Sequence, residues 1–214
     1  MELQGKIINI LGDSITYGVG ASDAEHSYPA VLQRLTEAAQ VRNYGVSGTR
    51  IARQQKDDED WDRKRAFVER YVHMEDEADL VIVFGGTNDY GHGDAPFGTL
   101  ADRTPHTFCG ACHVLFQGLL RKYPTTRLVV MTPMQCGSCS TRRAISGKLL
   151  KDYADALIQI AGEYSIPVLD LYRSLGITFE VPEQGERFCP DGLHPNDAGA
   201  ERIAYMLAEF LRTL

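Results

Sequence analysis

Residues 80–89 read LVIVFGGTND. Five apolar residues in a row, with no alternation of polar and apolar side chains, are typical of a strand buried on both faces of a sheet. The small and polar residues that follow indicate the turn in which this strand ends. This stretch therefore predicts an inner strand of a parallel sheet, with polar groups at the strand's carboxyl end.

Four more short apolar runs predict further strands, at residues 6–11, 41–46, 127–132 and 167–171. Segments with helical periodicity lie between or after them, at residues 28–39, 61–73, 107–122, 143–163 and 196–214. Strands that alternate with helices indicate an α/β fold, in which helices cover both faces of a parallel sheet. With no internal repeat and no linker, residues 1–214 are expected to form one domain.

The composition narrows the class of protein. The chain has 214 residues, 43% of them hydrophobic, and a formal net charge of −7, so it lacks the basic footprint of a nucleic-acid-binding protein. No apolar run approaches the twenty residues of a membrane-spanning helix, and the first residues do not resemble a signal peptide. Five cysteines, an odd number, favour a reducing compartment. We therefore expect a cytoplasmic protein.

The first predicted strand runs into GDSITYG, residues 12–18. A serine directly after a buried strand lies at the edge of the sheet where α/β proteins bind ligands. Ser14 is then either a reactive residue or simply the N-cap of a helix. The segment is neither the Gly-x-Ser-x-Gly of an α/β-hydrolase nor the Gly-x-Gly-x-x-Gly of a dinucleotide site.

Three other segments place polar residues at the same edge. NYGVSGT (43–49) and GGTND (85–89) follow the second and third strands, and they are either ordinary turns or converging hydrogen-bond donors. CPDGLHPNDAG (189–199) precedes the last helix. In it Asp191 and His194 are three residues apart, so the carboxylate can reach the imidazole within one loop. The alternative is a structural turn with an exposed histidine.

Taken together and in this order, the four segments resemble sequence blocks of the GDSL/SGNH hydrolase family. Residues 12–15 resemble the first block, 43–48 the second, 86–89 the third and 191–195 the fifth. Ile15 stands where that family has the leucine of its name. The resemblance implies a three-layer α/β/α sandwich with a five-stranded parallel sheet, of the flavodoxin-like kind, in a single SGNH hydrolase domain.

The resemblance also implies roles for individual residues. Ser14 is expected to be the nucleophile, His194 its general base, and Asp191 the residue that orients the imidazole. The oxyanion hole is expected to consist of the Ser14 and Gly48 backbone N–H groups and the Asn88 side chain. Flanking residues are expected to bind substrate, and these are Asp13, Thr87, Tyr90 and His92. This chemistry needs no metal and no cofactor.

Four cysteines allow a different interpretation. Cys109 and Cys112 form one Cys-x-x-Cys pair, and Cys136 and Cys139 form another, as in some structural zinc sites. The first pair lies in a predicted helix among apolar residues, where cysteine behaves as a small hydrophobic residue. We favour the absence of a metal, but a metal site or a redox pair remains an alternative.

The function predicted on this basis is hydrolysis of a small-molecule carboxylic ester through an acyl-enzyme. The loops expected to set specificity (20–27, 49–60 and 90–104) are polar and contain glycine, which favours short acyl groups such as O-acetyl groups on carbohydrates. The alternatives are a lysophospholipase or thioesterase for longer chains, a non-catalytic binding domain, a flavodoxin-like nucleotide binder and a zinc protein. The sequence does not indicate an oligomeric state.

Overall fold

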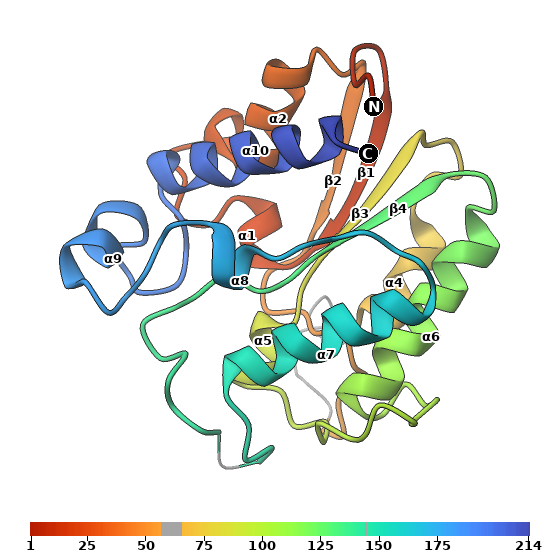
Figure 1. The fold of residues 1–214 in the computed structure, drawn as a ribbon, viewed down its shortest axis with the longest axis vertical. Helices are drawn as coiled ribbons and strands as arrows, with labels where there is room; N and C mark the ends of the chain where they lie inside the picture. The colour runs from red at the N-terminus through yellow and green to blue at the C-terminus, as the bar shows by residue number, and fades with distance from the viewer. Residues whose placement is uncertain (57–65, 144) are drawn as a thin grey trace.

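The five apolar runs form one parallel sheet in the computed structural model, which describes residues 1–56, 66–143 and 145–214. The strands are β1 (Ile7–Gly12), β2 (Gln40–Gly45), β3 (Leu80–Phe84), β4 (Arg127–Met131) and β5 (Val168–Leu169). Their order across the sheet is β2-β1-β3-β4-β5 (Figure 1). In this order the winding direction reverses between β1 and β3, and such a switch point opens a crevice at the carboxyl ends of the strands.

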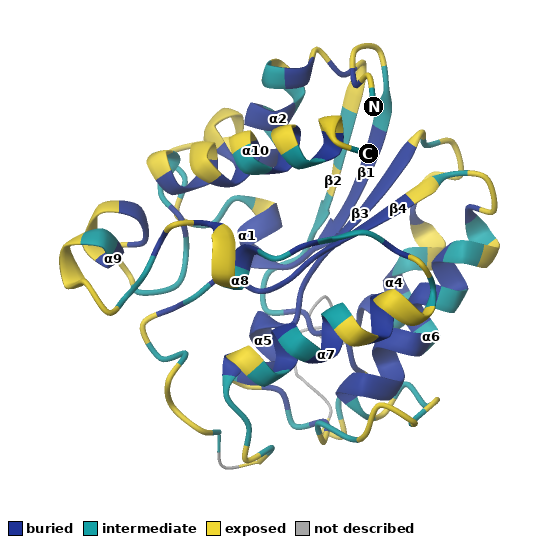
Figure 2. Ribbon diagram, viewed as in Figure 1, coloured by how far each residue is buried: buried dark blue, intermediate teal, exposed yellow. Residues whose placement is uncertain are grey.

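Helices cover both faces of the sheet. On one side lie α2 (Tyr28–Thr36) and α10 (Asp197–Arg212), and on the other lie α6 (Phe108–Lys122) and α7 (Leu150–Glu163) (Figure 1). Strand β3 is buried along its whole length (Figure 2). Its side chains alternate between two apolar clusters, one on each face of the sheet. The predicted three-layer α/β/α architecture with a five-stranded parallel sheet is therefore confirmed.

Short helices connect these elements. They are α1 (Ser14–Tyr17), η1 (Ala24–His26), α4 (Phe67–Arg70), η2 (Tyr71–His73), α5 (Thr87–Gly91), α8 (Leu171–Ser174) and α9 (Pro182–Phe188). Two of them, α1 and α5, follow directly on β1 and β3. The first residues of both helices therefore lie at the carboxyl edge of the sheet, beside the switch point.

Two helix boundaries differ from the prediction by three residues or more. The helix expected over 143–163 begins only at Leu150, because Gly147 adopts a positive φ of 66° and its N–H bonds back to the Arg143 carbonyl in a turn. The helix expected over 28–39 ends at Thr36, where Glu37 takes the left-handed conformation. Of the helix expected over 61–73, residues 61–65 lie outside the described residues.

The last helix begins as the sequence suggests. Asn196 precedes α10, and its side-chain oxygen accepts a hydrogen bond from the Gly199 N–H at 3.1 Å. Such a side chain satisfies one of the N–H groups left free in the first turn of a helix. Because the cap lies two residues after His194, it also fixes where the preceding loop ends.

Strand β2 forms one edge of the sheet, and side chains bond to its backbone. The Val41 N–H donates to Gln33 Oε1 at 2.9 Å, and the Gly45 N–H donates to Asn43 Oδ1 at 2.8 Å. An edge strand whose backbone N–H groups are bonded to side chains is a poor template for pairing with another strand.

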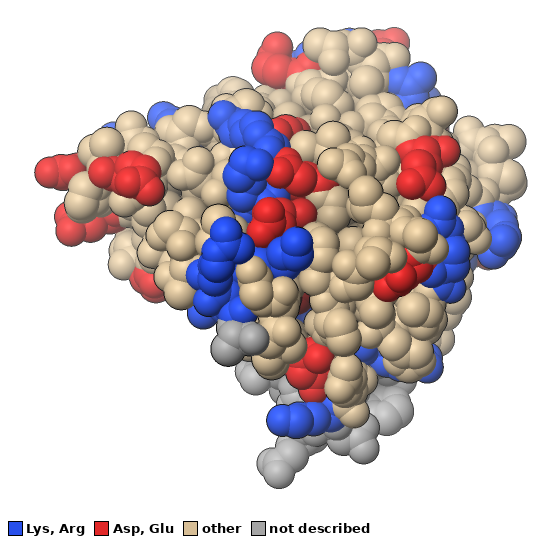
Figure 3. Space-filling model, turned by 60° about the horizontal axis from the view of Figure 1, so that its bottom comes forward, with Lys and Arg blue, Asp and Glu red and all other residues tan. Residues whose placement is uncertain are grey.

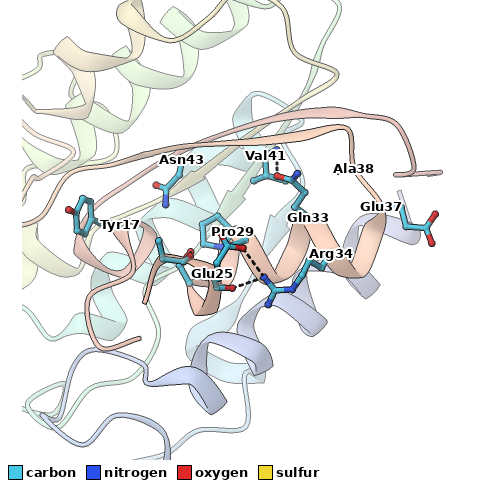
Figure 4. Close-up of a pocket in the computed structure, with 12 residues that line it drawn as sticks. Tyr17, Glu25, Pro29, Gln33, Arg34, Glu37, Ala38, Val41 and Asn43 are labelled. Atoms are coloured by element: carbon cyan, nitrogen blue, oxygen red, sulfur yellow. Dashed lines mark hydrogen bonds and ion pairs between the residues drawn. The ribbon is translucent and has the colours of Figure 1, made fainter. Parts of the chain in front are cut away.

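A groove of about 650 Å³ runs between β2 and α2, with Tyr17 and Asn43 toward one end (Figure 4).

Close packing between α1 and β2 requires a glycine at position 45. A Cβ added to Gly45 would lie 2.2 Å from the Tyr17 backbone nitrogen and 2.7 Å from the Thr16 carbonyl carbon. These are backbone atoms, so they cannot rotate away. The absence of a side chain here therefore sets how closely the turn that carries Ser14 approaches β2.

Substitution of Gly45 by alanine is therefore expected to lower the free energy of unfolding by about 1–3 kcal/mol or more, as is typical of overpacking. The control is Gly162→Ala in α7, where an added Cβ meets nothing within 4 Å. This control should be neutral or stabilising by up to ~1 kcal/mol. Urea denaturation followed by circular dichroism measures both, and equal stability of the two variants would contradict the packing argument.

Candidate active site

The register of the sheet brings three strand ends to one level. Gly12 of β1 lies opposite Gly45 of β2 on one side and Phe84 of β3 on the other. The chain leaves all three strands at the same edge because they are parallel. The segments that carry Ser14, Gly48 and Asn88 therefore start from adjacent points, although they are far apart in the sequence.

Three polar side chains form a continuous hydrogen-bonded line at this edge. Ser14 Oγ lies 2.9 Å from His194 Nε2, and His194 Nδ1 lies 2.6 Å from Asp191 Oδ2. Ser14 is 7% exposed, whereas the Asp191 side chain is 55% exposed. The line therefore runs from a buried hydroxyl to a carboxylate at the surface, and the structure brings together the three residues predicted to form a triad.

The loop around Asp191 orients this carboxylate. Its Oδ1 accepts the backbone N–H groups of Leu193 at 2.9 Å and His194 at 2.7 Å, which leaves Oδ2 to face the imidazole. Burial raises the pKa of Asp191, but the hydrogen bonds from His194 and Leu193 outweigh it, so the net pKa lies below its ordinary value. The carboxylate is therefore ionised at neutral pH, as a group that supports an imidazolium must be.

Asn88 lies in α5 with its amide held from several directions. Its Nδ2 donates to the Thr49 carbonyl oxygen at 3.0 Å and lies 3.4 Å from Asp13 Oδ2. Its Oδ1 lies 2.9 Å from His92 Nε2. Gly48, in the turn after β2, has a positive φ of 75°. The Asn88 amide is thus bonded both to that turn and to the residue before Ser14.

A buried carboxylate ties the same turn to α5. Both oxygens of Asp89 accept backbone N–H groups, from Ile51 at 2.8 Å and Ala52 at 3.0 Å. Burial nevertheless raises the pKa of Asp89 to about 6, against the lowering effect of these bonds. No role for Asp89 was predicted from the sequence. Its position directly after Asn88 was the one feature that could have indicated a place in the site.

Two arginines near the site were also missed. Arg70 donates to the carbonyl oxygens of Tyr44 and Gly12 and to the Thr49 hydroxyl, so it links the ends of β1 and β2. Arg50 Nη2 lies 2.7 Å from His92 Nδ1. The position of Arg50, a charged residue between a polar turn and the apolar pair 51–52, could have indicated that its side chain is buried near the site. No motif or periodicity in the sequence marks Arg70.

The residues expected to bind substrate have other partners here. Asp13 is 2% exposed, caps α1 by accepting the Ile15 N–H at 3.0 Å, and has a pKa raised to about 6 by burial. The Tyr90 hydroxyl bonds to the carbonyl oxygens of Ser138 and Thr141. Both nitrogens of His92 face protein atoms. The Thr87 hydroxyl is buried and has no hydrogen-bond partner among the described residues. Their contact with substrate stays a prediction.

The cysteines take two different environments. Cys109 and Cys112 are fully buried in the apolar cluster beneath α6. Cys136 and Cys139 flank Gly137, whose N–H donates to the Gly192 carbonyl at 2.8 Å, so this pair adjoins the loop of Asp191 and His194. Within the described ranges, no group of three or more His, Cys, Asp or Glu side chains is arranged to hold a metal ion.

Charges of both signs are interspersed on the face shown in Figure 3. Several of the charged side chains at the protein surface form ion pairs: Arg173 pairs with Asp170 at 2.8 Å and also with Asp155, which in turn pairs with Lys151 at 2.6 Å. Among the helices of the described residues, none is both long and apolar enough to cross a bilayer.

Of the loops expected to set specificity, residues 57–60 fall outside the described part of the chain.

Comparisons with known proteins identify related sequences over most of the chain. The GDSL-like Lipase/Acylhydrolase family matches residues 10–202. An acetylxylan esterase from Xylanibacter ruminicola is 24% identical over 94% of this chain. The match covers 42% of that esterase, so this chain spans less than half the length of its curated relative.

Solved structures share the whole fold. A protein from Lactobacillus plantarum is 34% identical, with a TM-score of 0.84 over 98% of both chains. A possible lipase from Chitinophaga pinensis is 23% identical, with a TM-score of 0.71 over 97% of this chain and 98% of its own. At that lower identity the likeness concerns the fold alone.

The raised pKa of Asp13 predicts a pH-dependent stability. A carboxyl whose pKa is about 6 when folded and 3.8 when unfolded stabilises the protein below pH 4, and this contribution is lost as the pH rises through 6. Between pH 4 and 7, wild type should therefore lose on the order of 2–3 kcal/mol relative to Asp13→Asn. Urea unfolding of both proteins at each pH measures the difference.

The control for this measurement is Asp102→Asn. Hydrogen bonds from the Thr99 and Thr107 hydroxyls lower the pKa of Asp102, so its contribution is present at neutral pH and lost in acid. Because that loss falls below pH 4, the stability of Asp102→Asn relative to wild type should change little between pH 4 and 7. A stability difference for Asp13→Asn that does not change with pH, or that changes in favour of wild type, would contradict the raised pKa.

Proposed function

The chain belongs to the GDSL-like lipase/acylhydrolase family, and from that membership we propose that it is a serine-dependent carboxylic ester hydrolase. One observation carries the proposal: the unbroken line from the Ser14 hydroxyl through the His194 imidazole to the Asp191 carboxylate, with links of 2.9 and 2.6 Å. A hydroxyl within hydrogen-bond reach of an oriented imidazole is the arrangement that nucleophilic catalysis by serine requires.

In the proposed acylation step, Ser14 Oγ attacks the ester carbonyl carbon while its proton passes to His194 Nε2. The new Oγ–C bond gives a tetrahedral intermediate with a negative oxygen. Collapse of this intermediate breaks the bond to the alcohol oxygen, which takes the proton from His194. The products of the step are an acyl-serine and a free alcohol.

Asp191 acts in this scheme through the histidine. Its carboxylate accepts a hydrogen bond from the Nδ1–H group, which leaves Nε2 unprotonated and able to act as base toward Ser14. When Nε2 becomes protonated, the adjacent negative charge stabilises the imidazolium. Since Asp191 is also held by two backbone N–H groups of its own loop, little reorganisation is needed during the reaction.

The negative oxygen of the intermediate needs preorganised donors. We assign them to the Ser14 and Gly48 backbone N–H groups and to the Asn88 side-chain N–H. The contacts of Asn88 support this assignment. One N–H of its amide is held by the Thr49 carbonyl at 3.0 Å, and the second, whose contact with Asp13 Oδ2 is long at 3.4 Å, is the donor assigned to the oxyanion. Loss of one such donor typically costs about 3–4 kcal/mol of transition-state stabilisation.

Deacylation repeats the same steps with water as the nucleophile. His194 takes a proton from the water, whose oxygen attacks the acyl carbon. Collapse then breaks the bond between that carbon and Ser14 Oγ, Oγ takes the proton from His194, and a carboxylic acid is released. The proposed chemistry is complete with protein groups and water.

For the substrate we propose a short acyl ester, such as an O-acetyl group on a carbohydrate. The polar composition of the neighbouring loops supports this choice, and the acetylxylan esterase named above is a relative of this kind. The second candidate is a lysophospholipase or thioesterase that accepts longer chains. A non-catalytic binding domain is the third, and the complete Ser14–His194–Asp191 line argues against it.

Replacement of Ser14 by alanine tests the reaction. The variant should lose hydrolysis of p-nitrophenyl acetate by at least about a thousandfold in kcat, because no nucleophile remains, while its thermal unfolding stays near that of wild type. Ser174→Ala, at an exposed serine in α8 outside the loops expected to set specificity, is the matched control and should keep full activity. An active Ser14→Ala protein would refute the mechanism.

Acyl-chain length tests the substrate class. Values of kcat/KM for p-nitrophenyl acetate, butyrate and decanoate should fall as the chain lengthens, because polar loops offer no apolar sheath for ten carbons. Release of acetate from acetylated xylan, measured beside them, tests the carbohydrate. A preference for decanoate would favour the lysophospholipase or thioesterase instead.

A further inference from the structure

His92 has both ring nitrogens engaged. It follows the last residue of α5, four positions after Asn88, a spacing that brings two side chains to the same side of a helical turn. Its Nε2 lies 2.9 Å from Asn88 Oδ1, and its Nδ1 lies 2.7 Å from Arg50 Nη2. The imidazole therefore bridges a buried guanidinium and the amide proposed for the oxyanion hole.

The proton positions in this bridge follow from chemistry. A guanidinium has only donors, so Arg50 must donate, and His92 Nδ1 must accept without a proton of its own. The proton of the neutral imidazole then resides on Nε2, which must donate to Asn88. Because only an oxygen can accept there, the amide orientation of Asn88 is also determined: Oδ1 faces His92 and the NH₂ group faces the other way.

The bonds on the far side of Asn88 agree with this orientation. Its Nδ2 donates to the Thr49 carbonyl oxygen and approaches Asp13 Oδ2, and both of these atoms accept. A flipped amide would set its NH₂ against the Nε2–H of His92 and its oxygen against the Thr49 carbonyl. A flipped amide would also lose the second N–H that is assigned above to the oxyanion.

The backbone around Arg50 is held by hydrogen bonds. Arg50 is 9% exposed, and its carbonyl oxygen accepts the Phe67 N–H at 2.8 Å. The next two residues donate their N–H groups to Asp89, which adjoins Asn88 in α5. Residues 49–52 are thus joined to α5 and the residue after it at Asn88, Asp89 and His92, and the Arg50–His92 contact determines which imidazole nitrogen carries the proton.

We propose that Arg50 and His92 are positioning residues for the oxyanion hole: Arg50 fixes the tautomer of His92, and His92 fixes the amide of Asn88 with its N–H toward the developing oxyanion. This inference rests on the proposed ester hydrolysis. It gives His92 a role in place of the direct substrate contact expected from the sequence.

The test compares two substitutions of similar length at position 92. His92→Gln supplies an amide N–H for Asn88 and an oxygen for Arg50, whereas His92→Met fills the same space with no N–H donor. His106→Met, at an exposed histidine, is the control for the substitution itself. Thermal unfolding of each variant shows whether packing is retained.

The kinetic readout separates positioning from binding. With p-nitrophenyl acetate, His92→Met should lower kcat by about 10- to 100-fold, less than the loss typical for deleting an oxyanion donor, with KM nearly unchanged. His92→Gln should recover most of this loss. In an Asn88→Ala background, His92→Met should cost little more, because the amide that it positions is already absent.

The outcomes are distinguishable. Equal kcat for His92→Met and wild type, an effect on KM alone, or a full additional loss in the Asn88→Ala background would overturn the positioning role while leaving the esterase intact. Equal losses in His92→Met and His92→Gln would do the same, since hydrogen bonding would then not matter. A wild type without hydrolysis, or an active Ser14→Ala, would overturn the proposed function and this inference with it.

Discussion

The parallel pairing of β1 with both β2 and β3 is the constraint on which the rest of the site depends. Because Gly12 is level with Gly45 and Phe84, the turns after the three strands leave the sheet side by side. A shift of one residue in either pairing would reverse which side chains face each apolar layer, so the buried faces of β1 and β3 hold the register. The core thereby determines where Ser14 and Asn88 lie relative to each other.

In the loops at the carboxyl edge of the sheet, carboxylates that accept hydrogen bonds from backbone N–H groups hold the segments of the site in position. Asp89 accepts two such groups from residues 51–52, and Asp191 accepts two from its own loop, each at 2.7–3.0 Å. A carboxylate can accept several N–H groups at once, so it organises loops that have little apolar surface of their own. Burial of Asp89 acts against its ionised form, and its raised pKa reflects that opposition.

Much of this arrangement could be predicted from the sequence. The features that could not be predicted share one cause, which is their dependence on contacts or turns that leave no local pattern. Unbroken apolar runs such as residues 80–84 indicate strands buried on both faces, so the sheet could be predicted from them. The proposed triad followed from the resemblance of short segments to a known family. The partners of Arg70 and His92 depend instead on contacts between distant segments, which leave no local pattern. The helix start at Leu150 was missed because the turn at Gly147 interrupts an otherwise helical composition.

The closeness of Asp191 and His194 in the chain has an entropic consequence. Two partners three residues apart close a very small loop, so little conformational entropy is lost when they meet. The contact between Ser14 and His194, by contrast, spans 180 residues and forms only when the sheet and α10 are in place. The imidazole and its carboxylate thus form a local unit that can assemble before the rest of the fold. Only the contact between Ser14 and His194 requires two distant segments to meet, so the triad is completed by a single long-range contact.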